Sequence, residues 1–176
     1  MAKLRKACAY RKLERPYTRK SKFKAKSFVR ASPQCKIVKF NMGNLKKTYP
    51  FVFHLVSKND IQLRHNALES ARLACLRVLE KALGKSGYSF QVRVYPHHIL
   101  RENPLASGAG ADRMSTGMKC SFGKAIGVAA RVKVGKEIFT VTVPKEHREI
   151  ARRALKSAGY KFACQSSVVE ENNHQK

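Results

Sequence analysis

Residues between His97 and Arg131 include several types that can bind phosphate groups. The run from Gly108 to Arg113 reads GAGADR, but a dinucleotide-binding turn needs a third glycine where Arg113 stands and a strand directly before the first glycine. The run from Gly117 to Ala125 reads GMKCSFGKA. A P-loop has a shorter spacing between its glycines, and it carries a serine or threonine for Mg²⁺ where Ala125 stands. We therefore reject both small-molecule phosphate sites.

The same stretch contains residues that could hold a metal or act as a nucleophile. His97 and His98 are adjacent, and adjacent side chains of an extended chain point to opposite sides, which does not suit a shared zinc ion. Ser107 or Cys120 could be paired with one of these histidines, yet the neighbouring residues match no known nucleophile motif. His54 falls in an apolar segment and is expected to be a core histidine. The pattern therefore predicts no enzyme, no bound metal and no cofactor.

The cysteines are far apart and form no CxxC pair, which predicts free thiols rather than disulfides or a zinc site. They are Cys8, Cys35, Cys75, Cys120 and Cys164. Cys75 falls on the apolar face of an expected helix, where it should pack rather than react. Free thiols are typical of a reducing compartment such as the cytoplasm.

The net charge is the strongest signal in the sequence. The 176 residues include 37 lysines and arginines and 11 acids, which gives a formal charge of +26. Such a charge repels itself in a compact chain unless a polyanion neutralises it, and nucleic acid is the most suitable one. A membrane surface is the competing partner, but the sequence has no apolar run of transmembrane length and its basic residues are not confined to one amphipathic helix. The N-terminal residues lack the apolar segment of a signal peptide, so we expect no export.

Residues 1–34 are expected to form a basic arm. Glu14 is its single acid, and aromatic residues such as Tyr17 and Phe23 are interleaved with the basic ones. The segment offers too little apolar surface to fold alone, so we expect phosphates to order it, with arginines on phosphate oxygens and aromatic rings on bases or sugars. We assign RNA binding in the arm to Arg5, Arg11, Arg15, Arg19, Lys20, Lys22, Lys24, Lys26 and Arg30.

Residues 35–170 are expected to form one α+β globular domain, and residues 171–176 a polar C-terminal tail. Apolar residues at alternating positions predict strands, and apolar residues three or four apart predict helices. The expected strands are 35–40, 50–57, 88–95, 125–134, 137–143 and 160–170, and the expected helices are 66–84 and 144–158. Asn66 and Glu69 should cap the first helix as a capping box, and Pro144 should begin the second. This order favours an antiparallel sheet sandwich with two helices on one side.

The apolar residues of segment 101–115 follow neither the strand alternation nor the helix spacing, so the segment is expected to be a long glycine-rich loop. Its small residues let the backbone come close to a partner, and Arg101 and Arg113 at its base can hold phosphates. Asp112 would either orient Arg113 or cap the following turn. We assign the loop's contacts to Arg101, Glu102, Asn103, Ser107, Gly108, Ala109, Gly110, Ala111, Asp112 and Arg113. Further RNA contacts are expected from Lys119, Lys124, Arg148, Arg152 and Arg153, the last three on the basic outer side of the second helix.

Five segments together resemble one protein family. They read RPYTRKSKFK, QLRHNALESARLA, YPHHILREN, SGAGADRMSTGM and FGKAIGVAARV. They resemble the universal large-subunit ribosomal protein that is numbered sixteen in bacteria and ten-e in archaea and eukaryotes, in its archaeal form. The resemblance extends from about Ala2 to Val169. The pair Cys120 and Ser121 and the ending SSVVEENNHQK depart from the family pattern, which leaves the terminal contacts open.

The resemblance implies a fold and a set of partners. The fold would be a sandwich of the β-hammerhead type. The partners would be large-subunit ribosomal RNA, including the 5S RNA region, the acceptor end of transfer RNA, neighbouring ribosomal proteins and late assembly factors, with no membrane and no second copy of the chain. The loop would approach the peptidyl transferase centre, and the protein would support transfer-RNA positioning and late subunit assembly in the cytoplasm. The alternative is a stand-alone RNA-binding factor for ribosome assembly.

Overall fold

The computed structural model describes residues 4–15, 23–27, 29–106, 108–115 and 117–172, without the side chains of Lys24, Met114 and Asn172. The strands are β1 (Asn41–Gly43), β2 (Phe51–Ser57), β3 (Ile61–Arg64), β4 (Ser89–Val92), β5 (His98–Glu102), β6 (Lys124–Val132), β7 (Glu137–Val143) and β8 (Ser166–Asn172). The α-helices are α1 (His65–Leu83), α2 (Ala111–Met114) and α3 (Arg148–Gly159), and short 3₁₀ turns cover Ala7–Ala9, Lys24–Lys26 and Lys145–His147.

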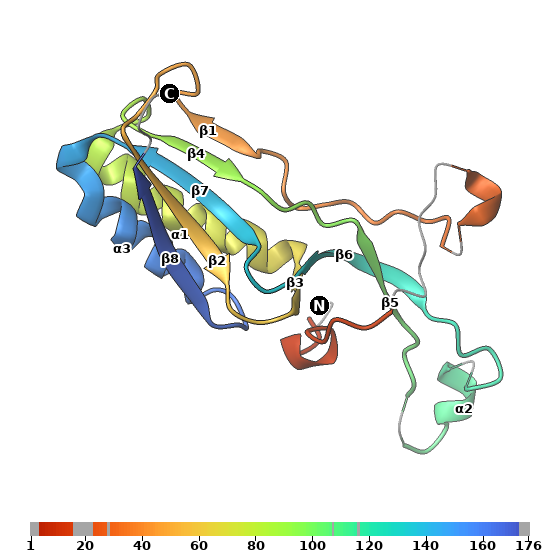
Figure 1. Ribbon diagram of the computed structural model, residues 1–176. Helices are drawn as coiled ribbons and strands as arrows, with labels where there is room; N and C mark the ends of the chain where they lie inside the picture. Colours follow the sequence, from red (N-terminus) through yellow and green to blue (C-terminus); the bar gives the residue numbers. More distant parts are fainter. Residues whose placement is uncertain (1–3, 16–22, 28, 107, 116, 173–176) are drawn as a thin grey trace.

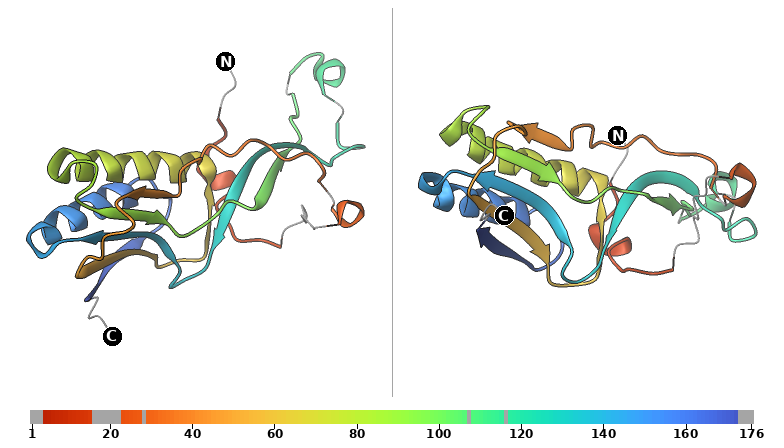
Figure 2. Two further views of the ribbon diagram at one scale, coloured as in Figure 1. Left: turned by 90° about the horizontal axis from the view of Figure 1, so that it is seen from above. Right: turned by 45° about the horizontal axis from the view of Figure 1, so that its top comes forward.

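The strands form two antiparallel sheets. The large sheet has the order β1-β4-β7-β2-β8, and the small sheet has the order β3-β6-β5 (Figure 1). The two long helices, α1 and α3, pack against each other on one face of the large sheet (Figure 2). The expected α+β class, antiparallel pairing and one-sided helices are therefore confirmed.

The main hydrophobic core lies between the large sheet and the helices. The alternation expected along residues 88–95, which contain β4, is confirmed, because Tyr88, Phe90, Val92 and Val94 are all buried. The ring of Phe139 lies edge-on to that of Phe90, with centroids 5.2 Å apart. A second, much smaller cluster under the small sheet contains only Val29, Ile99 and Val128 as buried members among the described residues.

Helix α1 was predicted almost to the residue, but its expected cap is wrong. The helix begins at His65, its N-cap residue Arg64 makes no side-chain cap hydrogen bond, and Asn66 Oδ1 accepts only from the N–H of the next residue, Ala67, at 3.1 Å. Glu69 does not form a capping box, because its carboxylate pairs with Arg72 one turn later. The helix ends as expected at Gly84, whose φ of 66° is in the left-handed region that favours glycine. Cys75 is fully buried on the inner face of α1, as its position in the sequence predicts.

Several strand assignments differ from the sequence-based expectation. Residues 35–40 are not a strand, and the pairing begins instead at β1, where Met42 faces Phe90. Strands β3 and β5 were missed, and β5 includes Arg101 and Glu102, which we had placed in the loop. Strand β8 begins at Ser166 and continues to Asn172, so it includes the first residues of the expected polar tail.

The second long helix starts later than the sequence predicts, whereas the core histidine lies where it was expected. A 3₁₀ turn follows Pro144, and the α-helix proper starts only at Arg148 and includes Gly159. His54 is buried in β2, and its Nδ1 lies 3.0 Å from Thr140 Oγ1 on β7. Its identification as a satisfied core histidine is therefore confirmed.

Two of the chain crossings between the sheets lie next to each other. One crossing leads from β2 to β3 and the other from β6 to β7. They are hydrogen-bonded to each other, because Ser57 N–H donates to Lys136 O at 3.1 Å and Gly135 N–H donates to Ser57 O at 2.9 Å. Asp60 Oδ1 accepts the N–H of Val134 at 2.8 Å. The small sheet is thus joined to the large one by two strands that also pair with each other.

Candidate nucleic-acid interface

The connection between β5 and β6 projects from the end of the small sheet, away from the large sheet (Figure 1). Its root is held at three points. The guanidinium carbon of Arg101 lies 4.2 Å from the ring centroid of Phe122, which is cation–π geometry. Asn103 Nδ2 donates to Gly117 O at 3.3 Å. A Cβ at Gly123 would lie 2.5 Å from the carbonyl carbon of Glu102, so the two backbones approach as closely as only glycine permits.

The outer part of this connection carries the single-turn helix α2. Gly108 and Gly110 have φ values of 121° and 78°, and the chain turns through them into α2. Asp112 and Arg113 lie in that turn and are exposed. Our expectation that Arg101 and Arg113 stand together at the base is therefore wrong, because Arg101 belongs to β5 and Arg113 to the projecting part. The tip presents small residues together with one charge of each sign.

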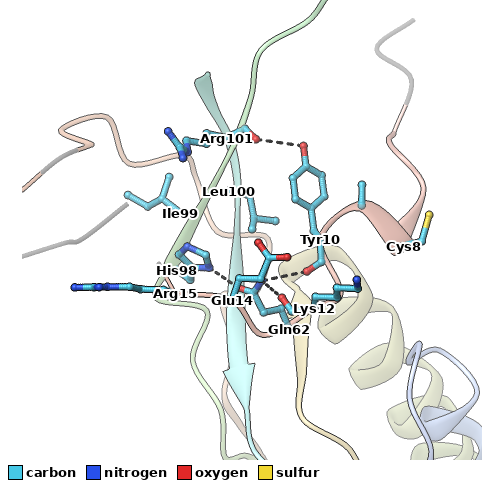
Figure 3. Close-up of a pocket in the computed structure, with 11 residues that line it drawn as sticks. Cys8, Tyr10, Lys12, Glu14, Arg15, Gln62, His98, Ile99, Leu100 and Arg101 are labelled. Carbon is cyan, nitrogen blue, oxygen red and sulfur yellow. Dashed lines mark hydrogen bonds between the residues drawn. The ribbon is translucent and has the colours of Figure 1, made fainter. Parts of the chain in front are cut away.

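The N-terminal arm lies over the polar face of the small sheet (Figure 3). In the strand register, Gln62 on β3 lies opposite Arg131 on β6, and His98 on β5 lies opposite Ala129, which is two residues before Arg131 on β6. Since alternate residues of a strand share a face, the side chains of Gln62, Arg131 and His98 are on one face of the small sheet. Gln62 Nε2 donates to Lys12 O at 2.7 Å and to Tyr10 O at 3.2 Å.

The bonds of Gln62 also determine the tautomer of His98. Since the Gln62 amide nitrogen donates to two carbonyls of the arm, its Oε1 must be the acceptor toward His98 Nδ1. Neutral His98 therefore carries its proton on Nδ1 and keeps Nε2 as an acceptor. Burial lowers the pKa of His98, and the charges of Arg131 and Arg101 lower it further.

The arm also contacts the root of the projecting loop. Tyr10 Oη donates to Arg101 O at 3.4 Å, and Arg5 Nε lies 3.2 Å from Glu102 Oε1. Arg64 Nη1 donates to Arg5 O at 2.9 Å, which ties the start of the arm to the end of β3. The arm, the small sheet and the loop root are thus one bonded unit. A cavity of about 230 Å³ lies between arm and sheet, and Figure 3 shows the Glu14 and Arg15 side chains at it.

The outer face of α3 is the second basic surface. Arg148 and Arg152 both bind the carboxylate of Glu170 on β8, with Arg152 Nη2 at 2.6 Å from Glu170 Oε2. Burial alone would raise the pKa of Glu170, but the hydrogen bonds and charges of these arginines outweigh it, so that pKa is lowered. Arg153 and Lys156 are exposed, and no acid of the described chain is within ion-pair distance of either.

The predicted RNA-binding residues are distributed over both surfaces. Among those described, the exposed ones are Arg5, Arg11, Arg15, Lys26, Arg30, Lys119, Lys124, Arg152 and Arg153, and Arg148 is half-buried. Arg19, Lys20, Lys22 and Ser107 lie outside the described residues, as does the side chain of Lys24. No local sequence pattern indicates the contacts among Gln62, His98 and Tyr10, because they depend on strand pairing between distant segments.

Metal-binding groups and membrane-spanning helices were also sought among the described residues. In the described ranges no group of three or more histidine, cysteine or acidic side chains could hold a metal ion. No helix in the same ranges has the length and apolar character needed to cross a membrane.

Comparison with known proteins identifies the family. The family model described as ribosomal protein L16p/L10e matches residues 13–169. The chain belongs to this family. Among the family's archaeal members, the large ribosomal subunit protein uL16 of Methanococcus aeolicus is 47% identical over 167 residues, which are 94% of this chain and 93% of the relative.

Other archaeal relatives are similarly close. The large ribosomal subunit protein uL16 of Methanococcus maripaludis is 49% identical over 167 residues, again 94% of this chain and 93% of the relative. That of Archaeoglobus fulgidus is 43% identical over 166 residues, which are 94% and 92% of the two chains. The resemblance to the archaeal form, first seen in the sequence motifs, is thereby confirmed.

Proposed function

We propose that the chain is a structural constituent of the large ribosomal subunit in the cytoplasm. It binds ribosomal RNA near the transfer-RNA sites and the peptidyl transferase centre, and it supports transfer-RNA positioning and late subunit assembly without catalysing a reaction. The family membership supports the ribosomal assignment. The single structural observation that carries the RNA-binding part is the unit of arm, small sheet and projecting loop, in a chain with a charge of +26.

The arm and the loop would have different tasks. The arm supplies the phosphate contacts, since its basic residues, including Arg11 and Arg15, are exposed while its backbone is bonded to Gln62. The loop is thin and glycine-rich, which suits close approach to a crowded RNA surface and the acceptor end of transfer RNA. Its backbone and the α2 turn, with Asp112 and Arg113, would make those contacts.

Sedimentation of the tagged chain from an archaeal cell extract tests the ribosomal role. We expect it to move with the large subunit and to stay there in moderately raised salt. A chain found mainly in the free fraction contradicts the proposal. The alternative, a stand-alone assembly factor, predicts that the chain is present on immature subunits and absent from translating ribosomes.

Shortening residues 104–111 tests the loop separately. The described root contacts of Arg101, Asn103 and Gly123 stay outside the deletion. We expect the variant to fold and to enter large subunits, while translation or the last maturation step is impaired. Unfolding of the variant would show that the loop is a structural element and not a contact element.

On α3, the RNA contacts should come mainly from Arg153 and Lys156, which form no ion pair within the described part of the chain. Arg153→Ala should lower the slope of log affinity against log salt by about 0.7 to 0.9, the value for one lost phosphate contact. Arg148→Ala and Arg152→Ala should each change the slope less, because Glu170 already binds both side chains. Arg19→Ala in the arm should resemble Arg153→Ala. Binding to a ribosomal RNA fragment across a salt series measures all four, and equal slopes for Arg153→Ala and the parent chain would exclude the α3 contact.

A further inference from the structure

A groove lies beside helix α1, and none of the described residues of the arm or the loop lines it. It is bounded by the segment that leads into β1 on one side and by α1 on the other, and it encloses about 560 Å³. Its apolar residues are aliphatic: Val38 is 80% exposed, Leu73 is 50% exposed, and Leu76 forms a buried part of the wall. Exposed aliphatic side chains that face each other across a groove mark an interaction site more often than scattered ones do.

The acidic residues of the groove already have partners. Glu69 accepts from both ends of the Arg72 guanidinium, with Arg72 Nε at 2.8 Å, and Arg72 Nη1 also reaches Met42 Sδ. Glu80 Oε1 accepts from Tyr88 Oη at 3.4 Å. These contacts fix the groove's shape and partly neutralise its acids.

The basic residues at the rim are not neutralised. Lys36 and Lys39 stand on the side of Val38, and Arg77 stands one turn after Leu73 on α1. All three are exposed, and within the described ranges no carboxylate forms an ion pair with any of them. The groove therefore combines an aliphatic floor with a rim that lacks counter-charges.

This combination fits a protein segment better than RNA. RNA that contacts a protein outside its phosphates uses base stacking on aromatic or guanidinium planes. The described lining of the groove contains no aromatic residue, and of its two guanidinium groups that of Arg72 is already bound by Glu69 and Met42, which leaves only that of Arg77 at the rim. By contrast, α3 presents an almost purely charged face with Arg152, Arg153 and Lys156. An aliphatic side chain in the groove would bury Val38 and Leu73, and nearby carboxylates would match the rim.

We propose that this groove docks an extended segment of a second protein in the large subunit. The segment inserts an aliphatic side chain between Val38 and Leu73 and places carboxylates beside Lys36, Lys39 and Arg77. Because the partner is sought in assembled subunits, the proposal rests on the proposed function, although it concerns a different surface.

Site-specific photo-crosslinking in assembled subunits tests the proposal. A photoreactive phenylalanine replaces Val38 in the full chain, and a matched variant carries it at Val134, another exposed valine, 62% exposed, in the turn between β6 and β7. Sedimentation first establishes that both variants enter large subunits, so failure of the ribosomal role is recognised before any crosslink is read. Mass spectrometry then identifies the crosslinked peptide or nucleotide.

We expect a crosslink from position 38 to one defined peptide that contains aliphatic and acidic residues, and no such crosslink from position 134. Reversing two rim charges, with Lys36→Glu and Lys39→Glu together, should lower the yield by about fivefold, as for two exposed ion pairs. Crosslinks to RNA only, to a second copy of this chain, or to a peptide without acidic residues would overturn the proposal. Absence of any crosslink from position 38 in subunits that contain the variant would also overturn it.

Discussion

The two sheets of this protein are stabilised in different ways. The large sheet and helices α1 and α3 enclose a continuous core that includes Phe90, Phe139 and Leu155. The small sheet adds Ile61, Leu63 and Val132 to that core where it meets the large sheet, but around β5 it covers only a minor apolar cluster. The other face of the small sheet is held by hydrogen bonds to the arm through Gln62. Burial fixes the first region regardless of partners, whereas the β5 end and the arm depend on polar contacts that a bound polyanion can reinforce. This less tightly packed end carries the proposed arm and loop contacts, while the proposed contacts on α3 belong to the large-sheet half.

The largest difference should appear on removal of core volume. Phe139→Ala removes a ring that contacts both Phe90 and Phe162, and it should lower the free energy of unfolding by about 3–5 kcal/mol. Val128→Ala in the small cluster should cost only about 1–2 kcal/mol. Urea unfolding monitored by circular dichroism measures both. Similar losses for the two variants would mean that the cluster around Val128 is packed as well as the main core.

Glycine substitution should separate the loop root from the rest of the small sheet. At Gly123 an added Cβ would meet the backbone of Glu102 and Asn103 at 2.5 and 2.8 Å, so Gly123→Ala should destabilise this region by about 1–3 kcal/mol. The matched control is Gly127→Ala in β6, where the nearest atom, His65 Nε2, is 3.4 Å away and belongs to a side chain. Hydrogen exchange of the β5 and β6 amides reports the effect. Equal protection in the two variants would contradict a tight root.

The arm should be released by loss of one side chain. Gln62→Leu leaves the carbonyls of Tyr10 and Lys12 without their donor and His98 without its acceptor, which should cost about 1–3 kcal/mol. Trypsin cleavage after Arg11 or Lys12 should then become faster, while the large sheet remains protected. Gln62→Glu is the control that keeps an acceptor for His98 but removes both donors to the arm. If the arm is cleaved at the parent rate in both variants, it is not held by Gln62.

The smallest effect should be a pH dependence. The pKa of His98 is lowered by burial and by Arg131 and Arg101, and the pKa of His65 is lowered by burial and by Lys36 and Arg64. Because the unfolded chain then binds protons more readily than the folded one, stability is complete above about pH 6.5 and decreases as the pH falls toward the folded pKa values. Thermal unfolding across this range should show the slope.

The double variant His65→Asn and His98→Asn should flatten that slope. Asn at position 65 still offers an acceptor to the Lys36 N–H, which donates to His65 Nδ1 at 3.2 Å in the parent chain. An unchanged slope would assign the pH dependence to other groups.

The sequence predicted what depends on local periodicity. The alternation from Tyr88 to Val94 and the spacing of Leu68, Cys75 and Leu79 located the fourth strand and the first helix, because each pattern reflects one buried face. Strand β5 was missed because Pro96 suggested an ending and because Ile99 and Leu100 are both buried, which hides the alternation. Strand β3 is too short for a period to be visible.

The site was predicted less completely because its contacts are made between distant segments. Charge alone assigned Arg148 and Arg152 to RNA, but only the pairing of β8 beside β2 brings Glu170 to them. The node of Gln62 and His98 requires β3 and β5 to lie on either side of β6. Neither relation leaves a local pattern in the sequence.

The connections between the sheets tie the base of the projecting loop to the large sheet. The connections from β2 to β3 and from β6 to β7 run side by side, and Ser57 bonds to Gly135 and Lys136 between them. Residues 93–97 form a further connection, from β4 to β5, and Arg93 N–H donates to Ile138 O on β7 at 2.9 Å. Because backbone hydrogen bonds hold these connections to the large sheet, the loop is aimed by the well-packed half of the molecule, and a partner bound at its tip is placed at a set position relative to α3.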